Sequence, residues 1–306
     1  MSRKLSYMKG IHSILTTPLN ADHSVDYDGL RKNVKFGTSS NVDALIVLGT
    51  QGEFYALDTE EKKEIIRVSV EAAEGKKPVI AGTSDSGTLT AVRLTQYAKD
   101  VGADAVIVTP PYYAAVSLDN VYSHFEQLNS VGIPIVLYNA PPRQGYNIPP
   151  EFLVKLTTQL ENIVAIKQAT QNIVEQEKTL ALLGEKVSVF GGSEAFMYPV
   201  LSLGHCGTST TAATCFPQYF VDMYEAVEAG DHKKAKEMFE GLEPFRRVCE
   251  KLGHAAVVKY VSEKYFGLAG GPMRLPLRTP SNEELAEVDE VVKNLRLVKE
   301  DTLQNT

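Results

Sequence analysis

The stretch Ile163-Val164-Ala165-Ile166-Lys167-Gln168-Ala169 indicates what kind of sheet this chain forms. The residues before Lys167 are apolar at both odd and even positions, so both faces of the strand must be covered. Strands of that kind are typical of parallel sheets with helices on either side. The stretch therefore predicts an inner strand of an α/β fold, and this strand ends in a single lysine.

Similar runs recur along the chain, with helical segments between them. Their starts lie roughly 20 to 35 residues apart, which is the length of a strand plus a crossover helix. Besides the stretch at 163–169, the expected strands are His12–Thr17, Asp43–Gly49, Pro78–Gly82, Ala105–Pro110, Pro134–Asn139, Val187–Gly191 and Gly207–Ala212. Eight strand–helix units predict a (β/α)₈ barrel. A doubly wound open sheet would need a Gly-x-Gly-x-x-Gly turn after an early strand, and the sequence contains none.

The last third of the chain has a helical pattern without further strands. Candidate helices are Asp231–Glu240 and Glu283–Asn294, followed by a polar tail. We therefore divide the chain into a barrel that carries the active site, residues 1–216, and a C-terminal helical layer packed on it, residues 217–306.

Composition excludes several classes of protein. With 306 residues, 43% of them hydrophobic, the chain can bury one large core. It has no apolar run long enough for a membrane span, and Met1–Tyr7 lacks the apolar core of a signal peptide, so we expect a soluble cytoplasmic protein. Three cysteines suggest neither a disulfide framework nor a zinc site. A net charge of −7 without a basic stripe argues against nucleic acid as a partner.

A barrel has its active site at the carboxyl ends of the strands, and unusual residues follow the strands there. They are Gly49-Thr50-Gln51-Gly52-Glu53, Thr109-Pro110-Pro111-Tyr112-Tyr113, Tyr138-Asn139-Ala140-Pro141-Pro142-Arg143, Lys167, Gly191-Gly192-Ser193-Glu194 and Ser209-Thr210-Thr211. A lysine in an apolar strand has a lowered pKa, and its neutral amine is a nucleophile toward a ketone.

Each of these signals also has a simpler explanation. Lys167 could extend to solvent, the tyrosine pair could be packing, and Arg143 could form a surface ion pair. The run Gly191-Gly192-Ser193 could instead bind a phosphate, and Ser209 could fill the barrel. Because all of them fall at the same rim, a joint catalytic role is the better interpretation.

Three of these motifs resemble a known family. Gly49-Thr50-x-Gly52-Glu53, the Tyr-Asn-x-Pro-x-Arg run at 138–143 and the Ile-Lys-x-Ala run at 166–169 are similar to the dihydrodipicolinate synthase and N-acetylneuraminate lyase family of class I aldolases. The likeness covers about Gly10 to Pro217 in the same order and spacing.

The resemblance implies a mechanism without a metal or organic cofactor. Lys167 would form an imine with the C2 carbonyl of pyruvate or a longer 2-oxo acid, and Tyr138 would transfer protons. Thr50 and a tyrosine from an adjacent subunit would complete the proton relay. That tyrosine matches Tyr112 when counted from Thr109 and Tyr113 when counted back from His124. The backbone N–H groups of Thr50 and Gln51 would hold the substrate carboxylate.

The substrate signals conflict. Gln51 stands where the family has Thr or Ser, which weakens a synthase assignment, whereas Arg143 stands where synthases bind the carboxylate of an aldehyde acid. Ser193 and Glu194 are similar to the pair with which sugar-acid lyases hold hydroxyl groups, and Ser209 is counted with them as substrate-binding. We expect cleavage of a 2-keto-3-deoxy sugar acid to pyruvate and an aldehyde.

Three alternatives remain for the function, and the family implies an assembly. The first alternative is 4-hydroxy-tetrahydrodipicolinate synthase, which condenses pyruvate with aspartate semialdehyde. A sugar-acid sensor or scaffold without activity is the second. A metal-dependent aldolase is disfavoured because the six histidines show no ligand spacing. The resemblance also implies a homotetramer built from two dimers.

Overall fold

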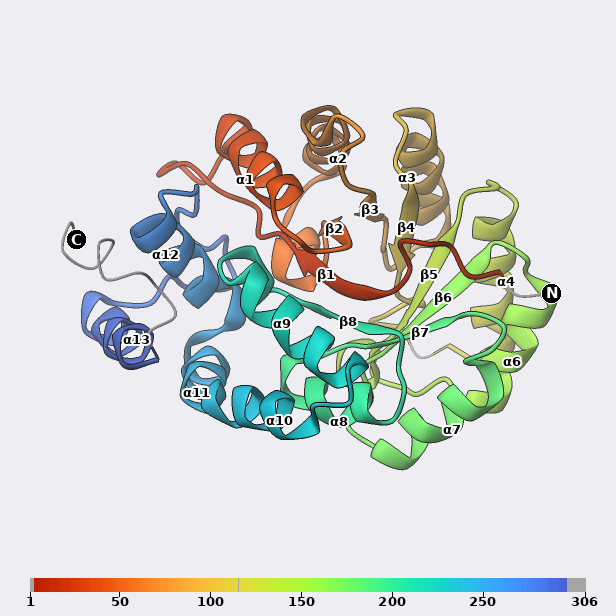
Figure 1. Cartoon of the computed structure of the whole chain (residues 1–306). Helices are drawn as coiled ribbons and strands as arrows, with labels where there is room; N and C mark the ends of the chain where they lie inside the picture. Colours follow the sequence, from red (N-terminus) through yellow and green to blue (C-terminus); the bar gives the residue numbers. More distant parts are fainter. Residues whose placement is uncertain (1–2, 115, 296–306) are drawn as a thin grey trace.

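A closed barrel of eight parallel strands forms the centre of the molecule in the computed structural model, which describes residues 3–114 and 116–295 (Figure 1). The strands are β1 Gly10–Ile14, β2 Ala44–Val47, β3 Val79–Gly82, β4 Ala105–Val108, β5 Ile135–Asn139, β6 Ile163–Gln168, β7 Ser188–Gly191 and β8 Gly207–Thr210. Each strand pairs with the next in sequence, and β8 closes on β1. The predicted (β/α)₈ barrel is confirmed, and each of the eight expected strands contributes to it.

The strand ends differ from the expected ones, most clearly in β1. It begins two residues before the expected start, because Gly10 pairs with Gly207 at a close approach of the two backbones. A Cβ on Gly207 would lie 2.1 Å from the Gly10 carbonyl oxygen. At its other end Thr16 and Thr17 are buried although they have left the sheet. Burial of a loop gives the same residue pattern as a strand, so the sequence could not separate the two.

Helices surround the barrel and short 3₁₀ turns follow several strands. The α-helices between strands are α1 Tyr27–Ser39, α2 Thr59–Ala73, α3 Thr88–Asp100, α4 Leu118–Asn129, α5 Pro141–Gln144, α6 Pro150–Gln159, α7 Ile173–Leu183 and α8 Met197–Ser202. The 3₁₀ turns are η1 Thr50–Gly52, η2 Phe54–Ala56, η3 Glu194–Phe196 and η4 Ala212–Thr214. The expected capping box at Asp58 and Glu61 starts α2.

In the described part of the chain five α-helices follow β8, and they gather on one side of the barrel in Figure 1. They are α9 Pro217–Glu228, α10 His232–Gly241, α11 Glu243–Leu252, α12 His254–Phe266 and α13 Asn282–Asn294. The expected helices at 231–240 and 283–294 correspond to α10 and α13, while the tail from residue 296 lies outside the described residues. Helix α9 packs on β1 and also on α10, so it contacts both the barrel and the helices that follow it. The division into two parts remains a proposal.

Apolar side chains form one cluster inside the barrel and another between the strands and the helices. Ile46, Ile107 and Val136 belong to the inner cluster. Because side chains alternate along a strand, Tyr138 points to the same side of β5 as Val136. Among the described residues no helix is both long and apolar enough to cross a membrane.

Candidate active site at the carboxyl ends of the strands

Lys167 and Tyr138 lie side by side at the mouth of the barrel. They are direct neighbours in the register of β5 and β6, and the Lys167 Nζ lies 4.4 Å from the centroid of the Tyr138 ring. Lys167 is only 5% exposed. Two adjacent parallel strands therefore bring together a buried amine and a phenol that are 29 positions apart in the sequence.

The Lys167 amine lacks a compensating charge in direct contact. Burial lowers the pKa of Lys167 to about 8, and the more distant charge of Glu194 only partly opposes this shift. Within residues 3–114 and 116–295, its Nζ donates no hydrogen bond and forms no ion pair, and it lies over the face of the Tyr138 ring. A larger fraction of this amine is therefore neutral near pH 7 than of an ordinary lysine.

Tyr138 remains a phenol at neutral pH. Burial raises the pKa of its hydroxyl, whereas a hydrogen bond with the Thr50 side chain and the charge of Arg143 act in the opposite direction. Thr50 therefore lies close enough to influence the titration of this hydroxyl, and the two residues line the same cavity.

The turn η1 brings Thr50 and Gln51 to the same mouth. The Gly52 N–H donates to the Gly49 carbonyl and the Glu53 N–H donates to the Thr50 carbonyl, which closes the turn after β2. Glu53 takes the left-handed conformation with φ of 57°. Thr50 and Gln51 are half-buried and line a cavity that also includes Tyr138, whereas Lys167 lines a small neighbouring pocket of about 10 Å³ that shares Thr50 and Tyr138 with it.

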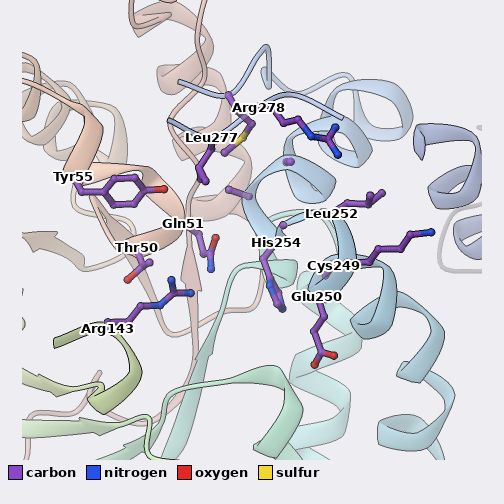
Figure 2. Close-up of a pocket in the computed structure, with 15 residues that line it drawn as sticks. Thr50, Gln51, Tyr55, Arg143, Cys249, Glu250, Leu252, His254, Leu277 and Arg278 are labelled. Carbon is purple, nitrogen blue, oxygen red and sulfur yellow. The ribbon is translucent and has the colours of Figure 1, made fainter. Parts of the chain in front are cut away.

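The cavity has a volume of about 410 Å³ and continues into an outer space of about 530 Å³ beneath the C-terminal helices. Arg143 is exposed at the border of both and has no ion-pair partner in the described part of the chain. Figure 2 shows Gln51 between Arg143 on one side and His254 on the other. A cation is therefore free to meet an anionic group of a ligand there.

Glu194 forms the opposite wall of the cavity. Its Oε1 accepts hydrogen bonds from the Thr210 hydroxyl at 2.6 Å and the Thr211 N–H at 3.0 Å, while its Oε2 lies 4.0 Å from His254 Nε2. Burial alone would raise the pKa of Glu194, but the charge of His254 and the Thr210 hydrogen bond outweigh it, and the pKa is lowered. The neighbouring Ser193 also lines the cavity and caps η3, where its Oγ accepts from the Ala195 N–H at 3.2 Å.

Ser209 and the tyrosine pair are placed differently from these residues. Ser209 is buried in β8, lines neither cavity, and its Oγ has no hydrogen-bond partner among the described residues. Tyr112 is half-buried against Phe54, with the ring centroids 6.1 Å apart, in a side pocket of about 200 Å³ that also includes Thr50. Tyr113 is fully exposed, with φ of 76°. Of the two tyrosines, only Tyr113 projects from the surface.

The C-terminal helices add side chains to the cavity that no sequence pattern marks as functional. Glu250 on α11 and His254 on α12 line both parts of it. His254 was considered only as a metal ligand, and no local pattern distinguishes it from the other histidines. Its place opposite Glu194 depends on how α12 packs on the barrel.

Comparison with known proteins agrees with the fold and the motifs. Residues 7–295 match the model of the dihydrodipicolinate synthetase family. A relative named 4-hydroxy-tetrahydrodipicolinate synthase, from Methanospirillum hungatei, is 34% identical over 93% of this chain and 98% of its own length. The enzyme of that name from Methanococcus vannielii is 34% identical over 95% of this chain and 100% of its own.

Solved structures lead to the same family. The crystal structure of dihydrodipicolinate synthase from Aquifex aeolicus superposes with a TM-score of 0.90 at 33% identity, and the match covers 95% of this chain and 99% of that one.

Proposed function

The chain belongs to the dihydrodipicolinate synthetase family of Schiff-base-forming aldolases, and from this premise we propose that it condenses pyruvate with aspartate semialdehyde. The observation that carries the proposal is the buried amine of Lys167, which lies beside Tyr138 and forms no ion pair within the described part of the chain. The names of the relatives favour this substrate pair over the sugar acid that we expected from the sequence.

Lys167 acts as the nucleophile in this proposal. Its neutral amine adds to C2 of pyruvate, the carbonyl oxygen takes up a proton to give a carbinolamine, and loss of water leaves a cationic imine. Loss of a proton from C3 then gives an enamine, which attacks the aldehyde carbon. With a pKa of about 8, about a tenth of the amine is neutral at pH 7, against less than about a thousandth for an unperturbed lysine.

Tyr138 and Thr50 move the protons. The Tyr138 phenol, protonated at neutral pH, donates to the carbinolamine oxygen so that water can leave, and recovers a proton through Thr50. The backbone N–H groups of Thr50 and Gln51 receive the pyruvate carboxylate, because N–H groups of a turn suit an anion.

Arg143 binds the carboxylate of the aldehyde partner, since it is a cation at the border of the cavity and forms no ion pair with the residues that the structure describes. A second candidate function is cleavage of a 2-keto-3-deoxy sugar acid. The wall formed by Glu194 favours it, because the outward-facing Oε2 can accept a hydrogen bond from a substrate hydroxyl. Ser193 would then help to bind the substrate hydroxyl groups. Ser209 would affect this binding only indirectly, through its neighbours in β8.

Assembly is part of the proposal. Tyr112 is held against its own barrel, whereas Tyr113 is fully exposed, so Tyr113 is the better candidate to enter the active site of a neighbouring subunit. Exposed Ile173 and Val174 at the start of α7 offer an apolar surface for a second contact. We propose a homotetramer made of two such dimers, located in the cytoplasm.

Trapping the imine tests the reaction class. Incubation with pyruvate and borohydride should add the mass of reduced pyruvate to the peptide that contains Lys167. Absence of an adduct, or an adduct at another lysine, rules out the mechanism and leaves the sensor or scaffold interpretation. If the adduct forms, the kcat/KM of this protein for condensing pyruvate with aspartate semialdehyde should exceed its kcat/KM for sugar-acid cleavage more than about tenfold. This ratio corresponds to a difference of roughly 1.4 kcal/mol in transition-state stabilisation.

Mixing inactive subunits tests the shared tyrosine. Lys167→Ala and Tyr113→Phe are combined and allowed to exchange subunits; if Tyr113 acts across the interface, random pairing restores about a quarter of the parent activity. Tyr112→Phe mixed in the same way is the matched comparison. If activity recovers only in the mixture with Tyr112→Phe, then Tyr112 is the tyrosine that acts across the interface. If activity recovers in neither mixture although mixed dimers have formed, the proton relay lies within one chain.

A further inference from the structure

A buried ion pair connects the turn after β2 to the C-terminal helices. Glu53 and Lys259 are each about 1% exposed, and Lys259 Nζ donates to Glu53 Oε1 at 2.5 Å. Lys259 lies in the middle of α12, and 206 positions separate it from Glu53 in the sequence. The Lys259 amine also donates to the Pro272 carbonyl at 2.9 Å.

The second carboxylate oxygen of Glu53 is bound by the same part of the chain. The Arg274 N–H donates to Glu53 Oε2 at 2.8 Å, so both oxygens are held by residues that follow the barrel. The Arg274 guanidinium in turn binds Glu61 with both of its terminal nitrogens, at 2.6 and 2.9 Å. Arg274 thereby fixes the start of α2, immediately beyond the turn.

The backbone at Glu53 depends on these contacts. Glu53 has φ of 57°, a conformation that is strained for a residue with a side chain and persists only where the surroundings impose it. Its N–H donates to the Thr50 carbonyl, so the conformation of Glu53 is coupled directly to the turn that presents Thr50 and Gln51. The contacts of α12 with η1 show that the two segments also pack together.

From these contacts we infer that Glu53 and Lys259 are positioning residues, through which α12 holds the Thr50–Gln51 turn in the geometry that binds the carboxylate of the 2-oxo acid. This inference rests on the proposed function. It makes the C-terminal part of the chain a part of the binding site, because α12 and the segment after it supply the partners of both Glu53 oxygens.

The test measures how much pyruvate is needed to half-saturate borohydride trapping at Lys167, a readout that requires no aldehyde. Lys259→Met and Glu53→Gln should each raise this concentration about tenfold or more, while the amount of adduct at saturating pyruvate stays near that of the parent. Lys264→Met is the matched control. Lys264 also lies on α12 and pairs with Asp289 at 2.6 Å, but it does not contact the turn, so its trapping curve should be that of the parent.

The double variant Glu53→Gln with Lys259→Met separates positioning from stability. It leaves neither buried charge unpaired, so the melting temperature should recover, but the link to α12 stays broken and half-saturation should remain at least about threefold above the parent. Recovery of both quantities would overturn the inference, as would an unchanged curve in a folded single variant. If Lys259→Met does not fold, the trapping curves of Glu53→Gln and of the double variant test the positioning role. Failure of the parent itself to form an adduct would instead refute the proposed function.

Discussion

Two buried lysines in this molecule have opposite surroundings. Lys259 lies under the turn after β2 and donates to the Glu53 carboxylate and to a backbone carbonyl. Lys167 lies at the end of β6 against the face of the Tyr138 ring, and in the described part of the chain it has no acceptor. Burial lowers the pKa of both amines, but at Lys259 the charge of Glu53 opposes the shift directly.

The difference shows that burial alone does not make a lysine reactive. A paired ammonium stays charged and serves as a structural link, because its partner compensates for the lost solvation. An unpaired one releases its proton more readily and becomes a nucleophile. The same residue type therefore holds the site together at one position and is proposed to perform the chemistry at the other.

Replacing the reactive lysine should have the largest effect on activity. Lys167→Met removes the amine and keeps the apolar stem, so turnover should fall about 10³-fold or more and no pyruvate adduct should form. Steady-state kinetics and mass spectrometry after borohydride treatment measure the two effects. Activity within tenfold of the parent would show that the two lysines do not differ in the way described.

Stability should change with opposite signs at the two lysines. Lys259→Met leaves the buried Glu53 carboxylate without its ion-pair partner and should lower the free energy of unfolding by about 3–5 kcal/mol. Lys167→Met removes an uncompensated buried charge. Since the folded pKa of Lys167, about 8, lies below the unfolded value of 10.5, its ionised form costs up to about 3 kcal/mol below pH 8.

Denaturant unfolding at pH 7 measures both effects. For the parent, the contribution of Lys167 makes stability rise with pH between about 8 and 10.5, where the unfolded chain binds more protons, and Lys167→Met should lack that rise. A loss of stability in both variants would mean that Lys167 has a charge partner after all.

Tyr138→Phe tests the group that faces the reactive lysine. The variant keeps the ring beside Lys167 and removes only the hydroxyl that is proposed to transfer protons, so turnover should fall about 10²-fold while folding is preserved. Circular dichroism checks the fold and initial rates check the activity. Turnover within a few-fold of the parent would limit Tyr138 to packing.

The pH dependence of trapping should be the smallest effect. Below pH 8 the rate of adduct formation at Lys167 should rise about tenfold for each pH unit, because only the neutral amine reacts, and it should level off above pH 8. Lys259 should form no adduct across this range. A trapping rate that still rises steeply at pH 10 would mean that the amine of Lys167 titrates like an ordinary exposed lysine.

Much of the fold and part of the site followed from local patterns. The eight strands were predictable because parallel strands covered on both faces are apolar throughout, and the capping box of α2 is a four-residue signal. Tyr138 and Lys167 could be placed together because both end neighbouring strands. His254 could not be placed, because nothing near it in the sequence indicates which part of the barrel α12 covers.

The sequence by itself determined the barrel, the family motifs and the identity of the candidate nucleophile, since strand periodicity and motif spacing are short-range properties. The tertiary structure decided which lysine has a partner. It also decided that Tyr113 rather than Tyr112 is exposed, and that Glu194 faces His254. The reason is physical: a pKa depends on burial and on nearby charges, and the group that compensates Lys259 lies 206 residues away from it in the chain.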